Sequence, residues 1–227
     1  MQSKIIGTVL PVLELQLDAD ERIVASPDHL SWMTPGFTLT TTTGGAGASG
    51  LFGRLSRAVS GGGLFMTEFH ADQSATVGFA ARLPGTILEV QTATGYMVHR
   101  DGFICGTPEV EVATALQNTL GGGLFGGEGF ILQKLSGNAT AWIELGGELV
   151  SYPLAAGQML QVHPGHVGMF EASVSFQITT MPGIKNALFG GDGLFLANLT
   201  GPGQVWLQTL TVPGLAHALA PYLPQKS

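Results

Sequence analysis

Charged side chains are scarce in this sequence of 227 residues, of which only 11% are Asp, Glu, Lys or Arg. Each helix of a soluble helical protein needs a charged outer face, so this scarcity argues against a helical fold. Lys and Arg number nine, they are spread singly, and the formal net charge is −7. Binding to a phosphate backbone depends on clustered cations, and the sequence therefore predicts no nucleic-acid partner.

Cysteine occurs once, as Cys105, and this excludes an internal disulfide bond. A single cysteine is typical of a protein from a reducing compartment. The sequence also lacks a long uncharged apolar run and the basic-then-apolar order of a signal peptide. We therefore expect a cytoplasmic protein without a transmembrane segment.

Motifs of common enzyme classes are missing as well. No Gly-x-Ser-x-Gly motif occurs, and the glycine runs at 61–63 and 121–123 are not followed by the Lys-Ser/Thr of a phosphate-binding loop. Cys105 has no arguable His or Asn partner, so we expect a small buried strand residue there rather than a nucleophile. The sequence thus predicts a protein that is not an enzyme and has no cofactor.

Glycine and apolar residues, by contrast, are abundant: 34 residues are Gly and 44% are hydrophobic. Many turns around a large core favour short strands over helices. Leu13, Leu15 and Leu17 alternate with Glu14 and Gln16, which is the period of a half-buried strand. The predicted fold class is all-β, a β-sandwich or barrel-like body with one or two short helices.

A short apolar segment around Phe65 recurs at Phe125 and Phe189, at spacings of 60 and 64 residues. Self-similarity at such a period indicates one structural unit used three times, none of which buries its apolar face alone. We therefore expect three pseudo-equivalent repeats in a single domain, with short helices at 51–59 and at the C-terminus. The predicted boundaries are 1–212 for the domain, about 5–83, 84–155 and 156–212 for the repeats, and 213–227 for the C-terminal helix and tail.

Two sets of side chains recur at matched distances from these phenylalanines. Glu68, Glu128 and Asp192 each follow by three residues, and Trp142 and Trp206 each follow by 17. A threefold arrangement would bring the three carboxylates toward one axis, where they would bind a hard cation or raise one another's pKa. Acids in Gly-rich turns also accept backbone N–H bonds, and both roles stay open. The two tryptophans are predicted to be core anchors.

A fragment of a metal site is suggested by His163 and His166 with Glu171 nearby. Two His and one carboxylate bind Fe or Zn in some β-sandwich enzymes. A separation of three does not place two ligands on one face of a strand, although the intervening Pro-Gly turn can bring them together. The alternative to a non-enzymatic protein is therefore a cupin-like, metal-dependent small-molecule enzyme. The remaining histidines are dispersed and are predicted to be surface or capping residues: His29, His70, His99 and His217.

Two motifs carry a resemblance to a known family. A Gly-Gly-acid-Gly-apolar motif occurs at 126–130 and 190–194, and Gly-Pro-Gly-Gln-Val-Trp occurs at 201–206. Over roughly residues 5–212 the sequence resembles the bacterial members of the altered inheritance of mitochondria protein 24 family. The resemblance implies a β-sandwich like that of the tryptophan RNA-binding attenuation protein, repeated with pseudo-threefold symmetry. It implies no established catalytic activity, and it links the eukaryotic members to mitochondrial inner-membrane organisation.

The mean hydropathy of +0.31 indicates that another subunit or a membrane partner covers some apolar surface. We therefore expect a non-enzymatic scaffold or binding module that self-associates. It would present loops such as 44–62 and the C-terminal segment to a protein partner, with peripheral membrane association and a link to membrane-associated assembly. A third alternative is a regulatory protein that binds a small ligand between repeats.

Overall fold

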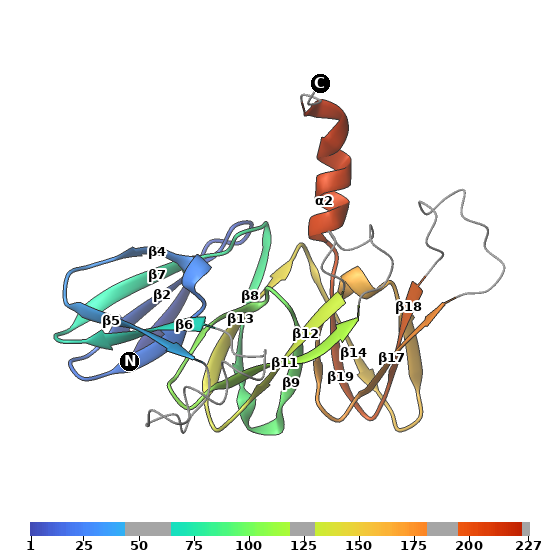
Figure 1. Cartoon of the computed structure of the whole chain (residues 1–227), viewed down its shortest axis with the longest axis horizontal. Helices are drawn as coiled ribbons and strands as arrows, with labels where there is room; N and C mark the ends of the chain where they lie inside the picture. Colours follow the sequence, from blue (N-terminus) through green and yellow to red (C-terminus); the bar gives the residue numbers. More distant parts are fainter. Residues whose placement is uncertain (44–64, 119–129, 181–194, 224–227) are drawn as a thin grey trace.

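The computed structural model describes residues 1–43, 65–118, 130–180 and 195–223, and these are nearly all β (Figure 1). Four sheets and a single α-helix account for the regular structure of these ranges, together with short 3-10 turns. The predicted all-β fold class is confirmed. The helix predicted at 51–59 lies outside the described residues.

Three successive sets of six strands follow an N-terminal strand, β1 (Gln2–Ile6), and we call each set, together with the connection after its last strand, unit 1, unit 2 or unit 3. Unit 1 contains β2 (Val12–Leu17), β3 (Arg22–Ala25), η1 (Pro27–His29), β4 (Leu30–Met33), β5 (Phe37–Thr43), β6 (Phe65–Ala71) and β7 (Ala75–Ala80). Unit 2 contains β8 (Gly85–Gln91), η2 (Thr92–Thr94), β9 (Tyr96–His99), β10 (Phe103–Gly106), β11 (Glu111–Asn118), β12 (Phe130–Ser136) and β13 (Thr140–Gly146). Unit 3 contains β14 (Leu149–Leu154), β15 (Met159–Val162), η3 (Pro164–His166), β16 (Val167–Glu171), β17 (Ser175–Thr180), β18 (Phe195–Thr200) and β19 (Gly203–Gln208).

The three units share one pattern of strand pairing. In each, the sixth strand lies between the first and the third, as β7 lies between β2 and β4. The fifth strand lies between the second and the fourth, as β6 lies between β3 and β5. Because β14 pairs with β19, residues 149–154 belong by pairing to unit 3, ahead of the predicted boundary between residues 155 and 156. The division into a single domain of three symmetric repeats and a tail stays a prediction.

Neighbouring units are joined edge to edge. Strand β3 of unit 1 pairs with β10 of unit 2, and β9 of unit 2 pairs with β16 of unit 3. Each joint fuses three strands of one unit with three of the next into a six-stranded sheet. Unit 1 and unit 3 therefore lie at opposite ends of the long axis (Figure 1).

The apolar core follows these joints. Leu13, Leu15 and Leu17 are fully buried, so the period-two alternation of the sequence predicted this strand correctly. They pack in one cluster with Ile104 and Trp142, which unit 2 contributes. Two further clusters likewise combine residues of adjacent units. Burial across the joints is what holds the units together.

The C-terminal helix α2 (Val212–Leu219) continues into the turn η4 (Ala220–Tyr222). Its first turn is capped by the Thr211 hydroxyl, which accepts a hydrogen bond from the Gly214 N–H at 3.1 Å. None of its residues is buried, and it projects away from the sheets (Figure 1). Among the described residues, no helix has both the length and the apolar character needed to cross a membrane.

Candidate functional site

Three similar turns, one in each unit, carry most of the histidines. In each turn the backbone N–H of the fourth residue donates to the carbonyl of the first, at 2.9–3.3 Å. Pro27 and Pro164 occupy the second position of two of these turns, where their fixed φ favours the bend. Each turn connects the second strand of its unit to the third. The turns are Ser26 to His29, His99 to Gly102, and His163 to His166.

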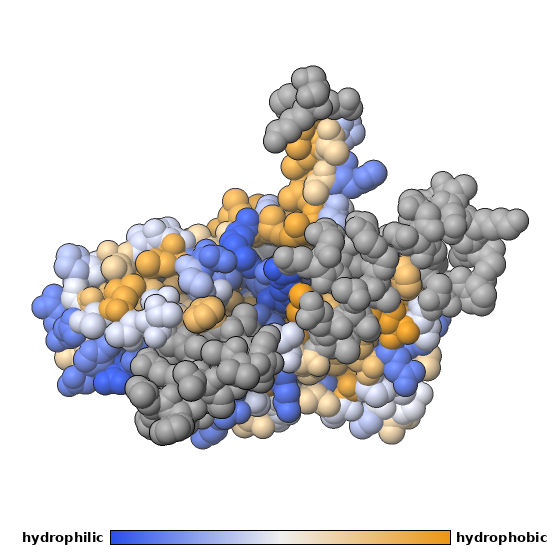
Figure 2. Space-filling model, viewed as in Figure 1, coloured by the Kyte–Doolittle hydropathy of each residue, from blue (hydrophilic) through white to orange (hydrophobic). Residues whose placement is uncertain are grey.

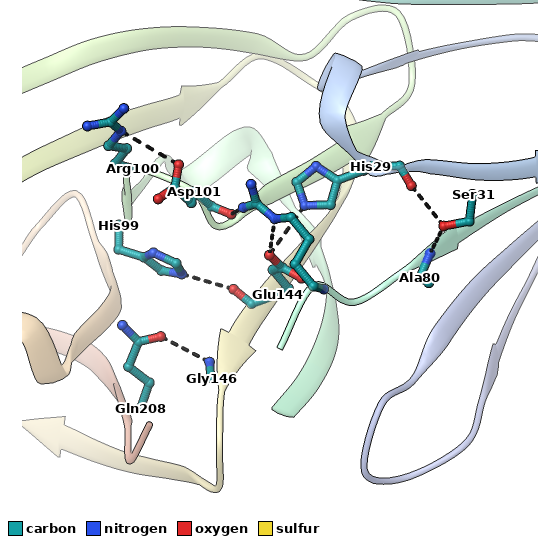
Figure 3. A network of polar contacts seen from close by, with 10 residues as sticks. His29, Ser31, Ala80, His99, Arg100, Asp101, Glu144, Gly146 and Gln208 are labelled. Atoms are coloured by element: carbon teal, nitrogen blue, oxygen red, sulfur yellow. Dashed lines mark hydrogen bonds and ion pairs between the residues drawn. The ribbon is translucent and has the colours of Figure 1, made fainter. Parts of the chain in front are cut away.

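An ion-pair network around the buried carboxylate of Glu144 joins unit 1 to unit 2 beside the first two turns (Figure 3). Glu144 of β13 accepts a hydrogen bond from the Arg82 guanidinium at 2.9 Å and another from the Arg82 backbone N–H at 3.0 Å. His29 places its Nε2 atom 3.3 Å from the same carboxylate and is only 2% exposed. The carboxylate thus contacts an arginine and a histidine of the preceding unit.

The electrostatics of this network favour fixed protonation states. Burial alone would raise the pKa of Glu144, but the contact with His29 and the N–H and charge of Arg82 outweigh it and lower the pKa. Burial lowers the pKa of His99, whose Nε2 donates to the Glu144 carbonyl at 3.0 Å. At neutral pH Glu144 is therefore ionised and His99 neutral, and His99 contacts the backbone carbonyl of Glu144 rather than its carboxylate.

An uncharged version of this network joins unit 2 to unit 3. Gln208 of β19 accepts a hydrogen bond from the Gly146 N–H at 3.0 Å, as Glu144 does from the Arg82 N–H. Its side-chain amide donates to the Gly165 carbonyl at 3.0 Å. His166 donates from Nδ1 to the Gln208 carbonyl at 2.8 Å. An amide and a glycine therefore stand where the first joint has a carboxylate and an arginine.

A pocket of about 310 Å³ lies between the two joints and is lined by residues of units 1, 2 and 3. The side chains of Arg82, Glu144 and Gln208 reach it but are engaged in the contacts above. Leu145, Leu210 and Val212 supply its apolar wall. A groove of about 560 Å³ beside it runs under α2. The polar groups that reach this pocket are therefore held by contacts within the chain.

The predicted metal ligands do not converge. The rings of His163 and His166 meet edge to face with centroids 5.8 Å apart. Glu171 lies at the far end of β16, where its carboxylate accepts a hydrogen bond from the Gln204 N–H at 2.9 Å. A strand rises about 3.3 Å per residue, so one metal ion cannot bind both His166 and Glu171. No group of three or more His, Cys, Asp or Glu in the described ranges could hold a metal. The cupin-like alternative is not supported.

Of the three acids predicted to lie near one axis, only Glu68 belongs to the described residues. Glu68 lies on β6 opposite Val24, with its carboxylate 3.6 Å from the Arg22 guanidinium. Strand register places Lys134 and Asn198 at the position of Glu68 in units 2 and 3. Glu128 and Asp192 lie outside the described residues, and their role stays a prediction.

The two tryptophans occupy matching positions, opposite the third strand of their unit. Trp142 is 1% exposed, and its indole N–H donates to Glu89 at 3.1 Å. Trp206 is half-buried and packs edge to face on Tyr96, with ring centroids 5.9 Å apart. In unit 1 this position is Gly78, where a Cβ atom would collide with the indole of Trp32 on β4. The large indole side chain therefore comes from the third strand in unit 1 and from the sixth strand in units 2 and 3.

Sequence reasoning missed the buried network because its members come from distant segments. His29 was expected at the surface or in a cap, yet it is buried against Glu144. The available signal was the likeness of Ser-Pro-Asp-His29 to His-Pro-Gly-His166. Cys105 is fully buried in β10, as predicted, and burial raises the pKa of its thiol.

The fold and this region together define a class of protein: an all-β protein of like-paired units joined through buried polar contacts. The chain belongs to the family described as Mitochondrial biogenesis AIM24, whose model matches residues 3–210. The resemblance seen in the sequence motifs is thereby confirmed, whereas the likeness to the tryptophan RNA-binding attenuation protein stays a prediction.

Two streptococcal proteins are similar to the chain. An uncharacterized protein of Streptococcus pyogenes serotype M6 is 24% identical over 222 residues, covering 96% of this chain and 88% of the relative. A Streptococcus pyogenes protein of known crystal structure is 20% identical and covers 98% of this chain and 99% of that one, with a TM-score of 0.76. This second likeness supports the fold alone.

Proposed function

We propose that this protein is a non-enzymatic assembly module that self-associates through an exposed sheet edge. One observation carries the proposal: β4 of unit 1 is exposed along its whole length, and its equivalents are buried. All four residues of β10 are buried, as are the first four of β16. In units 2 and 3 the third strand is covered by the preceding unit. In unit 1 no described strand covers it.

The exposed side chains of β4 are large and apolar. Leu30, Trp32 and Met33 are all exposed, and half of the Trp32 surface faces solvent. Contiguous apolar patches on soluble proteins usually mark contact surfaces. Covering this strand with protein would give it the environment that β10 and β16 already have.

Assembly next to a membrane is the finer part of this proposal. It rests on membership of a family whose eukaryotic members the sequence resemblance links to mitochondrial inner-membrane organisation. The C-terminal segment offers a second contact surface, because Val212 and Leu219 of α2 and Leu223 after η4 are exposed. Figure 2 shows apolar surface along one side of this projecting helix. We assign α2 to a protein partner.

The test is the mass of the protein in solution across a wide concentration range. Native mass spectrometry and light scattering are expected to show species larger than the 23.6 kDa chain, with a fraction that grows with concentration. A monomer at every concentration would overturn self-association. Stoichiometric metal retained in the same spectra would overturn the non-enzymatic assignment in favour of a metal site.

A further inference from the structure

We propose that copies of this chain associate head to tail, with β15 of one copy pairing antiparallel with β4 of the next. This inference rests on the proposed self-association and names its geometry. In the described part of the chain, β4 pairs only with β7, and β15 pairs only with β18. Both strands therefore offer an unpaired edge of backbone N–H and C=O groups.

The two joints inside the chain provide the template. In both, the second strand of one unit pairs antiparallel with the third strand of the next: β3 with β10, and β9 with β16. The strand β15 is the second strand of unit 3, and β4 is the third strand of unit 1. The chain forms this kind of joint twice internally, and β15 and β4 are the two strands that would form it between copies.

The register of the new joint follows from the internal ones. Ala25 pairs with Cys105 at the first joint, and Val98 pairs with Met169 at the second. Ala25 and Val98 each precede one of the three turns directly, and Val162 precedes the third. Like Cys105 and Met169, Trp32 lies one residue after the bulge in its pairing with the sixth strand. Val162 is therefore expected opposite Trp32.

One residue further along, Val24 pairs with Gly106 and Met97 pairs with Phe170. The equivalent pair at the new joint is Gln161 of one copy with Met33 of the next. Both residues are exposed in the single chain. They serve as the probes of the experiment below.

The chemistry of the two edges suits pairing. Natural edge strands are commonly protected by a charged residue or proline. The strands β4 and β15 contain neither. In the register above, Met159 of β15 falls opposite residue 35, just beyond the end of β4. Pairing would cover the exposed apolar residues of β4 and leave no charge buried.

The two edges differ from each other and lie in different units, so the contact is heterologous rather than twofold. A copy that uses β15 keeps its β4 free for another copy. Units 1 and 3 lie at opposite ends of the molecule, so both edges are available at once (Figure 1). Head-to-tail pairing therefore produces a closed ring or an extending chain of copies.

The experiment uses two single-cysteine substitutions in the full chain, Met33→Cys and Gln161→Cys. Directly opposed residues of antiparallel strands have Cα atoms about 4.5–5.5 Å apart, which a disulfide spans. The native Cys105 is buried and does not compete. One variant is labelled with ¹⁵N, the two are mixed and mildly oxidised, and the mass of the cross-linked dimer is read without reductant.

The mixture is expected to give a mixed disulfide dimer, and each variant alone to give none. A matched control mixes Met33→Cys with Val150→Cys, an exposed residue on the edge strand β14, and is expected to give none. Cross-linking of Met33→Cys with itself, or equal cross-linking with the control, would overturn the head-to-tail geometry. Larger species without the mixed dimer would overturn only the geometry, whereas a monomer would overturn self-association itself.

Discussion

At the scale of single residues, Glu144 provides polar contacts between the first two units. Its carboxylate is nearly buried and contacts both Arg82 and His29, which belong to the preceding unit. A buried carboxylate of this kind is costly to remove, because its partners lose the charge that compensates them. Gln208 shows that a neutral amide can fill the matching position when no arginine is present.

The substitution Glu144→Ala is expected to lower the free energy of unfolding by about 1–3 kcal/mol, because the Arg82 backbone N–H and the buried His29 ring lose the carboxylate that they contact. Glu144→Gln is expected to cost less, since its amide oxygen still accepts the Arg82 N–H as Gln208 accepts that of Gly146. Urea unfolding measures both. The exposed Glu148→Ala serves as control, and an equal loss in all three variants would contradict this role.

The same residues predict how stability depends on pH. The pKa of His99 is lowered from its ordinary value of 6.5 and that of Glu144 from 4.5. As the pH falls through 6.5, unfolded His99 takes up a proton that the folded state resists, so stability declines. A second decline begins below 4.5, where Glu144 protonates first in the unfolded chain. The melting temperature is expected to fall from pH 7 to pH 5 and again below pH 4.5. A melting temperature that stays constant or rises on acidification would contradict the prediction.

At the scale of elements, strand pairing repeats more faithfully than side chains do. Alternating leucines predicted β2, and glycine-rich composition predicted many short strands. The recurrence of Phe65 predicted three repeats with Phe125 and Phe189 at matching positions, but strand register places Ile131 and Phe195 at the position of Phe65. Connections of different length change the sequence spacing between equivalent strands, whereas backbone hydrogen bonds keep the strand register the same. A comparison of residue types at fixed spacing therefore could not align the units.

The candidate site was less predictable than the strands, for a physical reason. His29, Arg82 and Glu144 are brought together by the joint between units, and no spacing along the chain encodes that contact. The equivalence of the units is also hidden because unit 1 pairs Trp32 with Gly78 where unit 2 pairs Cys105 with Trp142. Packing requires that the space over a strand pair be filled, and a large side chain at either position can fill it.

A charge on β4 tests the role of this strand as an element. Met33→Lys is expected to reduce the larger species to monomer, because a lysine on an edge strand opposes pairing with another strand. Met33 is already exposed, so the melting temperature should change little. Val150→Lys, which places the same charge on the edge strand β14, is the matched control and is expected to leave the mass distribution unchanged. Equal effects of both variants would count against β4.

For the whole molecule, the arrangement of units makes each copy a link with two unlike ends. A copy carrying Met33→Lys keeps a competent β15 but cannot receive another copy on β4. Added in small proportion to the native protein, it is expected to stop growth at one end and shorten the assemblies. Light scattering of such mixtures measures the effect, with Val150→Lys at the same ratio as control. An average mass that falls only in proportion to the added variant would argue against directional growth.

The difference between the two internal joints also favours one order of units over another. Arg82 and Glu144 match each other at one joint, and Gly146 and Gln208 match each other at the other. If unit 1 docked on unit 3 during folding, the Arg82 guanidinium would face an uncharged amide, and Glu144 would lose its arginine. The ion pair between Arg82 and Glu144 is therefore expected to disfavour wrongly ordered docking and wrong exchanges between neighbouring copies, and so to help keep a repetitive chain in sequence order.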